Sequence, residues 1–294
     1  MSEFQREMQP WPALAPYARK VQLRSGLTLF AFEAGPGDAP PLVLIHGLGD
    51  EADTWRHVIA PLAERFRVVA PDLPGFGRSD KPDRTYSLAF LRDTIVELMD
   101  ALGWQTAGLM GHSLGAVIAQ VVALEHPARV RELILVSGSL TSRAQKLNPV
   151  ILQMALPFLG ERMYNSLRAS PDAAYATLRP YYANFDTLPE AERQFLYQRV
   201  NERVWSDGQR RAFLSILRQL IFVQAGRQKK LEARLAQLAT PTRAVWGEAD
   251  AVNSVESGRA LAAVQPGATL TVLPGVGHNV QQDAPEELVR VVLR

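Results

Sequence analysis

The stretch Gly111-His112-Ser113-Leu114-Gly115 stands between a short apolar run, residues 107–110, and a longer run of small and apolar residues, 116–124. The first run predicts a buried strand and the second a helix. A serine flanked by glycines at such a junction is typical of a nucleophile elbow, the sharp turn that exposes a reactive hydroxyl. The same junction places Ser113 at a helix N-terminus, where free N–H groups favour developing negative charge. We therefore interpret Ser113 as a nucleophile.

The composition excludes several classes of function. The 294 residues are 47% hydrophobic and 21% charged, with a net charge of +2 and no cysteine. A nearly neutral chain gives no reason to expect nucleic acid or an anionic membrane as a partner. The lack of cysteine rules out disulfides, thiolate catalysis and cysteine-ligated zinc. No segment has the pattern of a leader or a membrane span, so we expect a cytoplasmic location. The sequence indicates no oligomeric state.

The rhythm of apolar runs predicts the fold class. Helix-like segments alternate with strand-like runs at residues 41–45, 67–70, 107–110, 133–136, 242–246 and 269–273, after a hairpin at 21–32. This alternation predicts an α/β fold with a doubly wound, mostly parallel sheet. The rhythm stops between residues 139 and 228, where aromatic-rich, helix-like segments are separated by proline and glycine. We expect an all-helical cap at 139–228, a core at 19–138 and 229–294, and an N-terminal arm at 1–18. Most aromatic residues of the cap are expected to pack its own interior, and a minority to line a pocket.

Two aspartates have the positions of helix caps. Asp53 precedes a segment with one apolar helical face, and we expect it to be the N-cap of a helix that extends to Phe66. Asp283 and Glu286 have the spacing of a capping box, with Pro285 in the first helical turn. The sequence therefore predicts helices beginning at both aspartates.

A serine nucleophile needs a base and an acid that orients the base. His278 alone among five histidines follows the last strand in a glycine-flanked loop, so it is the predicted base. His46 and His112 each lie in a strand-to-turn junction, and we expect them to support the backbone. In a parallel sheet the strand ends meet at one edge, where ligands bind.

Three acids compete for the orienting role. Asp250 follows the penultimate strand and is the predicted partner of the base. Glu248, two residues earlier, is the local alternative and is expected to face solvent. Asp72 also ends a strand, but its proline- and glycine-rich loop suggests that it stabilises a turn. The predicted triad is therefore Ser113, Asp250 and His278.

The chain order Ser, Asp, His is that of the α/β-hydrolases. The chain resembles a cap-bearing serine hydrolase of this superfamily over roughly residues 20–294. The motifs that carry the resemblance are His46-Gly47-Leu48-Gly49, the loop 72–80, Gly111–Gly115, Trp246–Asp250 and Gly277-His278. The resemblance implies an oxyanion hole formed by the backbone N–H groups of Leu48 and Leu114. It also implies acyl transfer through an acyl-enzyme, with no metal and no organic cofactor.

Several reactions share this triad. Dehalogenases and epoxide hydrolases of similar shape have aspartate in place of Ser113, which argues against both. The loop His-Gly-Leu-Gly-Asp at residues 46–50 departs from the His-Gly-Gly-Pro-Gly pattern of proline iminopeptidases. A carboxylesterase, a lactonase, a carbon–carbon bond hydrolase of ring-fission products and a perhydrolase remain. The aromatic cap favours an esterase whose partner is a small to medium apolar ester. A slow-turnover ligand receptor on the same fold is the alternative of a different class.

Overall fold

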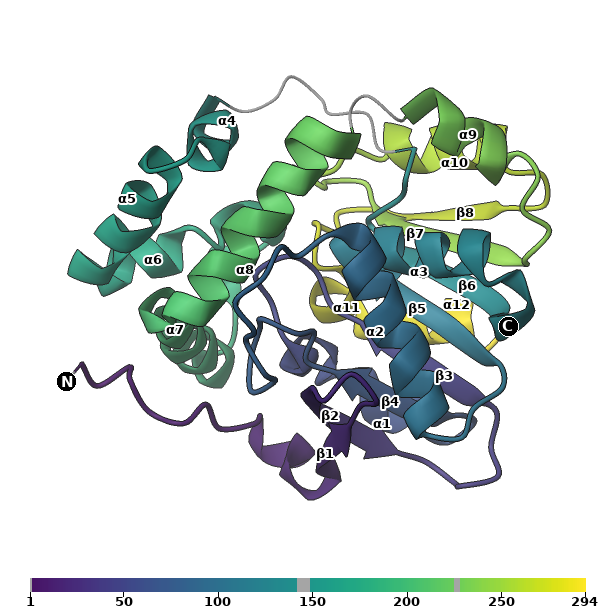
Figure 1. Ribbon diagram of the computed structural model, residues 1–294, viewed down its shortest axis with the longest axis horizontal. Coiled ribbons are helices and arrows are strands. Elements are labelled where there is room, and N and C mark those ends of the chain that lie inside the picture. Colours follow the sequence, from purple (N-terminus) through teal and green to yellow (C-terminus); the bar gives the residue numbers. More distant parts are fainter. Residues whose placement is uncertain (1, 142–148, 225–227) are drawn as a thin grey trace.

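The computed structural model describes residues 2–141, 149–224 and 228–294 (Figure 1). Its centre is an eight-stranded sheet of order β1-β2-β4-β3-β5-β6-β7-β8, in which β1, β2 and β4 pair antiparallel and all other neighbours pair parallel. The strands are β1 Ala18–Gln22, β2 Thr28–Ala34, β3 Pro41–Ile45, β4 Arg67–Pro71, β5 Ala107–His112, β6 Val130–Val136, β7 Thr242–Gly247 and β8 Thr269–Leu273. The predicted α/β fold with a mostly parallel sheet is thus confirmed.

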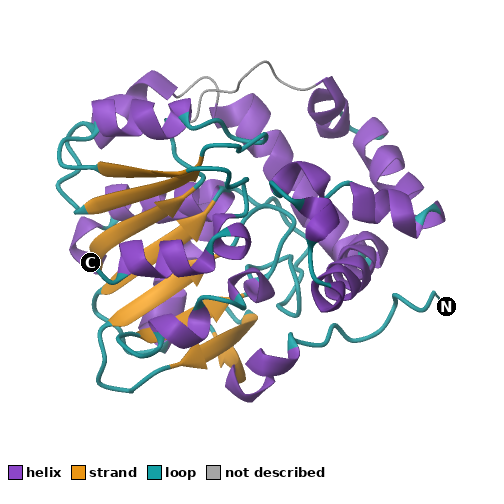
Figure 2. Ribbon diagram, turned by 180° about the vertical axis from the view of Figure 1, so that it is seen from behind, coloured by secondary structure: helices purple, strands orange, loops and turns teal. Residues whose placement is uncertain are grey.

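Helices cover both faces of the sheet, as the two opposite views show (Figures 1 and 2). One face carries α2 Leu88–Ala101, α3 Leu114–Glu125, α9 Gln228–Leu235 and α10 Glu256–Val264. The other carries α1 Ile59–Leu62, α11 Val280–Asp283 and α12 Pro285–Val292. Successive side chains of a strand enter opposite layers: Leu109 of β5 packs into the first and Met110 into the second. Burial on both faces explains why these strands are continuous apolar runs.

The insertion between β6 and β7 is helical. It contains α4 Pro149–Ala155, α5 Leu159–Ser166, α6 Pro171–Ala176, α7 Glu190–Trp205 and α8 Asp207–Arg218. Figure 1 shows these helices beside the sheet, next to the strand ends from which α3 and α11 depart. Two small apolar clusters form its interior, one around Tyr164 and Val200 and one around Tyr182 and Phe185. Within residues 149–224 the structure has no strand.

The N-terminal arm is packed against both parts of the molecule. The N–H of Trp11 donates to Asp53 Oδ1 at 2.5 Å, and the Trp11 ring meets Phe195 of α7 edge-on at 5.0 Å. Phe4 is buried and its ring lies 6.3 Å from that of Tyr197, also on α7. The arm therefore ties a loop of the core to a helix of the cap.

Asp53 is not the N-cap of a long helix, so that prediction is wrong. The segment forms a 3₁₀ turn, Ala52–Trp55, and then the four-residue α1, Ile59–Leu62. The Asp53 carboxylate is held instead by the Trp11 N–H and the Arg78 guanidinium. Two competing partners from distant parts of the chain have displaced the local capping interaction.

Candidate active site

Ser113 lies at a strained turn between β5 and α3. Its backbone has φ 52° and ψ −114°, a conformation that residues other than glycine rarely adopt and that costs ~1–3 kcal/mol. The strand and the helix approach closely, because a Cβ added at Gly111 would lie 2.2 Å from the Gly115 carbonyl oxygen. A Cβ at Gly115 would lie 2.0 Å from the carbonyl oxygen of Ile45. The two glycines of the motif are thus required by contact, as a nucleophile elbow demands.

His278 and Asp250 form a buried pair. His278 Nδ1 lies 2.8 Å from Asp250 Oδ2, and the two side chains are 1% and 0% exposed. The other carboxylate oxygen, Oδ1, accepts from the N–H groups of Val252 and Asn253, both at 2.8 Å. Both oxygens of Asp250 are therefore used, and the carboxylate can turn neither away from the imidazole nor toward solvent.

The two rival acids lie elsewhere. Glu248 is exposed. Asp72 accepts from the N–H of Ala52 at 2.8 Å and pairs with the Arg78 guanidinium at 2.8 Å. Burial alone would raise the pKa of Asp72, but Arg78 and the backbone donors overcome this and hold it below its ordinary value. Asp72 thus fixes the turn that follows β4, and of the three acids only Asp250 contacts His278.

His112 precedes Ser113 in the chain, and its ring packs against His278. Its ring lies 4.8 Å from the His278 ring, and its Nε2 donates to the His278 carbonyl oxygen at 3.1 Å. Burial and the neighbouring His278 lower the pKa of His112 to about 3. His112 therefore stays neutral near pH 7 and places no positive charge beside His278. In the described part of the chain, Ser113 Oγ makes no hydrogen bond with His278, a contact that often tightens only when substrate binds.

The loop after β3 passes next to the nucleophile. A Cβ at Gly47 would lie 3.4 Å from Ser113 Cβ, so the backbone just before Leu48 is adjacent to the elbow. His46 fixes this loop, because its Nε2 accepts from the Leu73 N–H at 2.8 Å and its Nδ1 donates to the Gly47 carbonyl at 2.8 Å. Burial lowers the pKa of His46 and keeps it neutral in this role. Both histidines at strand ends thus support the backbone, as expected.

Leu114 is the first residue of α3. The N–H groups of a first helical turn have no partner within the helix, so that of Leu114 is free to bind an anion. Together with the position of Leu48 on the adjacent loop, this is the arrangement that an oxyanion hole requires. The roles of Leu48 and Leu114 remain predictions.

Two arginines of α7 form ion pairs with the same loop after β3. Arg203 of α7 pairs with Asp50 at 2.5 Å and with Glu51 at 2.7 Å, and Arg199 approaches Glu51 at 3.3 Å. Glu51 is completely buried, and burial raises its pKa although both arginines oppose this. Phe213 of α8 packs on the loop as well, since a Cβ at Gly49 would lie 3.2 Å from its ring. The cap is therefore anchored immediately beside the predicted oxyanion hole.

Asp283 holds the loop of the predicted base instead of capping a helix. Helix α12 begins at Pro285 with Ala284 as its N-cap and without a side-chain cap. Asp283 Oδ2 accepts from the Gly277 N–H at 2.8 Å and from the Ala183 N–H at 3.0 Å. The capping-box prediction is wrong, because these two donors occupy the carboxylate.

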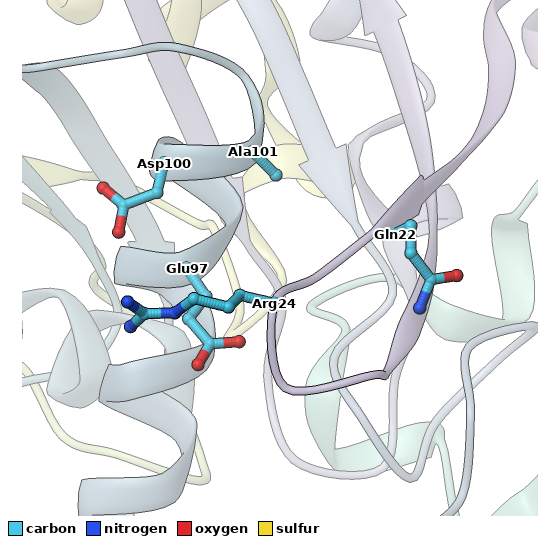
Figure 3. Close-up of a pocket in the computed structure, with 5 residues that line it drawn as sticks. All are labelled: Gln22, Arg24, Glu97, Asp100 and Ala101. Atoms are coloured by element: carbon cyan, nitrogen blue, oxygen red, sulfur yellow. The ribbon is translucent and has the colours of Figure 1, made fainter.

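A surface depression outlined by Gln22, Arg24, Glu97, Asp100 and Ala101 is a different place (Figure 3). It lies between the β1–β2 turn and the C-terminal end of α2. Helix α2 leads into the start of β5, whereas Ser113 follows the end of that strand. Its polar side chains therefore lie at the wrong edge of the sheet to join the triad.

The residues that the structure describes contain no group of three or more His, Asp or Glu side chains placed to hold a metal ion. No helix in ranges 2–141, 149–224 and 228–294 is long and apolar enough to cross a membrane.

Comparison with known proteins identifies the family of the chain. The family model for the alpha/beta hydrolase fold matches residues 40–285. The chain belongs to the α/β-hydrolase family. An uncharacterized protein of Mycobacterium tuberculosis is 31% identical over 298 residues, which cover 100% of this chain and 85% of that protein.

Two further relatives are named for an enzymatic activity. The 2-hydroxy-6-oxononadienedioate/2-hydroxy-6-oxononatrienedioate hydrolase 2 of Pseudomonas putida is 29% identical over 95% of this chain and 96% of its own length. The solved structure of a bacterial membrane phospholipase A matches with a TM-score of 0.72 and 26% identity, covering 94% of this chain and 84% of that one. The family and these relatives indicate a hydrolase.

Proposed function

We propose that this α/β-hydrolase is a serine hydrolase that cleaves small to medium apolar carboxylic esters through an acyl-enzyme. The observation that carries the proposal is the buried contact between His278 Nδ1 and Asp250 Oδ2, formed at the sheet edge where the elbow exposes Ser113. An aspartate on Nδ1 leaves the Nε2 lone pair of the imidazole to accept a proton. This is the state that a serine nucleophile requires.

The proposed reaction has two halves. Ser113 Oγ attacks the carbonyl carbon while His278 Nε2 takes its proton, and the N–H groups of Leu48 and Leu114 bind the oxyanion. Each such donor is typically worth ~3 kcal/mol of transition-state stabilisation. His278 then protonates the departing alcohol. A water molecule, deprotonated by His278, attacks the acyl-enzyme and releases the acid.

Carbon–carbon bond hydrolysis is the second candidate, because the Pseudomonas putida relative is named for a dienedioate and a trienedioate substrate. A substrate with two carboxylates needs cationic partners. In this chain Arg203, the cap arginine beside the oxyanion loop, is already paired with Asp50 and Glu51. This arrangement supports a neutral, apolar ester over a dianion.

The test is continuous hydrolysis of p-nitrophenyl esters of increasing acyl length by wild type and Ser113→Ala. Sustained turnover that the variant loses supports the proposal, and the chain-length optimum measures the acyl pocket. Labelling of Ser113 by a fluorophosphonate without ester turnover favours the carbon–carbon hydrolase, which is then assayed on ring-fission products. A single stoichiometric burst with no turnover on any substrate indicates a receptor. Absence of labelling refutes the assignment of Ser113.

A further inference from the structure

One cap residue lies directly against the predicted base. Tyr181 ends a 3₁₀ turn, Arg179–Tyr181, and its ring centroid is 5.6 Å from that of His278 with 58° between the planes. The Tyr181 carbonyl oxygen accepts from the Asn279 N–H, the residue after the base, at 2.9 Å. The side chain is partly exposed. Tyr181 thus combines a fixed backbone with a ring that borders the site.

Hydrogen bonds and backbone contacts hold the segment around Tyr181 against the loop of His278. Ala183 N–H donates to Asp283 Oδ2, which also accepts from the Gly277 N–H. A Cβ at Gly277 would lie 2.6 Å from the Ala183 nitrogen, so the two backbones touch. These bonds set the position of the Tyr181 ring relative to the imidazole independently of the remaining cap helices.

The chemistry of the base identifies what Tyr181 faces. The imidazole that accepts the serine proton later delivers it to the leaving group, so the leaving group must lie against the imidazole. A ring that packs on His278 from the cap side therefore borders the leaving-group side of the site rather than the acyl side.

The hydroxyl of Tyr181 is available for a ligand. Among described residues it makes no hydrogen bond, whereas the Tyr182 hydroxyl donates to Gln282 Oε1 at 2.6 Å and that of Tyr86 to the Pro82 carbonyl at 2.8 Å. Burial raises the pKa of Tyr181, and the carboxylates of Asp50 and Asp250 act in the same direction against Arg203. The phenol is therefore protonated at neutral pH and is a hydrogen-bond donor.

We propose that Tyr181 determines leaving-group specificity. Its ring forms the wall beside the departing alcohol, and its hydroxyl donates to an acceptor atom carried by that alcohol. This inference rests on the proposed ester hydrolysis. It assigns to the cap a residue of the leaving-group subsite, and it leaves the acyl preference to other side chains.

The experiment compares matched ester pairs that differ by one ether oxygen. Cyclohexylmethyl and tetrahydropyranylmethyl butyrate differ in the leaving group, and ethyl cyclohexylacetate and ethyl tetrahydropyranylacetate differ in the acyl group. We expect Tyr181→Phe to lower kcat/KM for the tetrahydropyranylmethyl ester about fivefold, the effect of one hydrogen bond, and to leave the other three within twofold. Tyr181→Ala should raise the rate with a naphthylmethyl leaving group relative to ethyl butyrate about tenfold.

Tyr175→Phe is the matched control. Its hydroxyl also lacks a partner in the described structure, but this hydroxyl is buried and the ring packs on Phe185 at 4.8 Å inside the cap. The control should change none of the four rates. An equal effect of Tyr181→Phe on the acyl pair, or no effect on either pair, overturns the inference.

Failure of the proposed function gives a different result. If no ester is turned over, the rates at which Ser113 is labelled by a fluorophosphonate and by the corresponding p-nitrophenyl phosphonate still report on the leaving-group side. A ratio of these rates that shifts at least threefold in Tyr181→Ala supports the inference although ester hydrolysis has failed. An unchanged ratio refutes it.

Discussion

Replacing Asp250 with asparagine should trap His278 in the wrong tautomer. The side-chain carbonyl of the asparagine must face the two backbone N–H groups from which Asp250 Oδ1 accepts hydrogen bonds in the native chain. The NH₂ group of the asparagine would clash with those donors. The NH₂ is then forced against His278 Nδ1, which lies 2.8 Å from the carboxylate in the native chain. The imidazole must offer a lone pair there and carry its proton on Nε2, where it cannot accept the proton of Ser113.

The expected loss in kcat is ~10⁴-fold, the magnitude found when the acid of a serine-protease triad is changed in this way. It corresponds to ~5.4 kcal/mol of transition-state stabilisation. The assay is hydrolysis of the best p-nitrophenyl ester, together with the rate of fluorophosphonate labelling, which should fall in parallel. Glu248→Gln is the control, since replacing that exposed acid should leave kcat and the labelling rate unchanged. An Asp250→Asn enzyme within tenfold of wild type, or a loss in Glu248→Gln instead, would refute the reasoning.

Three further predictions concern residues outside the triad. A Cβ at Gly138 would lie 2.2 Å from the Ser113 carbonyl oxygen, so Gly138→Ala should lower kcat at least ~10²-fold, whereas Gly37→Ala, with nothing within 4 Å, should not. Asp72→Asn should cost ~3 kcal/mol at pH 7 in urea unfolding, because it leaves a buried guanidinium without its main partner. Since the folded-state pKa of Asp72 is lowered, its stabilisation is present above the unfolded pKa of ~3.9 and is lost on acidification; the gap to wild type should therefore narrow below ~pH 4, and a constant gap would contradict this. Arg203→Met should lower stability by ~3 kcal/mol, because it removes the main partner of a buried carboxylate, and an unchanged melting temperature would show that the pair contributes no net stability.

The fold was predictable because its signals are local. A buried strand such as 41–45 is apolar at every position, and Gly111 of the elbow is required by a contact with Gly115, only four residues away. The position of the helical insertion follows from where the alternation stops and resumes. The predicted partners Asp250 and His278 could be paired without knowing any distance, because the ends of adjacent parallel strands must meet.

What the sequence could not show are contacts between segments far apart. Asp53 and Asp283 both look like helix caps from their neighbours, and both are occupied by donors from distant residues, Trp11 and Ala183. Tyr181 is one of many cap aromatics, and no local pattern separates the one that meets His278 from those that pack together. The relevant information lies in how the cap is placed over the strand ends.

Helix α7 shows the physical reason most clearly. Its charged residues are the usual mark of a solvent-facing helix, yet Arg199 and Arg203 are 2% and 8% exposed. They are buried because Glu51, itself completely buried, supplies a counter-charge from a loop about 150 residues earlier in the chain. A charge that is paired and hydrogen-bonded can replace an apolar side chain at an interface, so hydropathy cannot distinguish the two faces of such a helix. The same substitution of charge for apolar contact connects the cap to the loop after β3, and it makes the placement of Leu48 depend on residues that a hydrophobic pattern would assign to solvent.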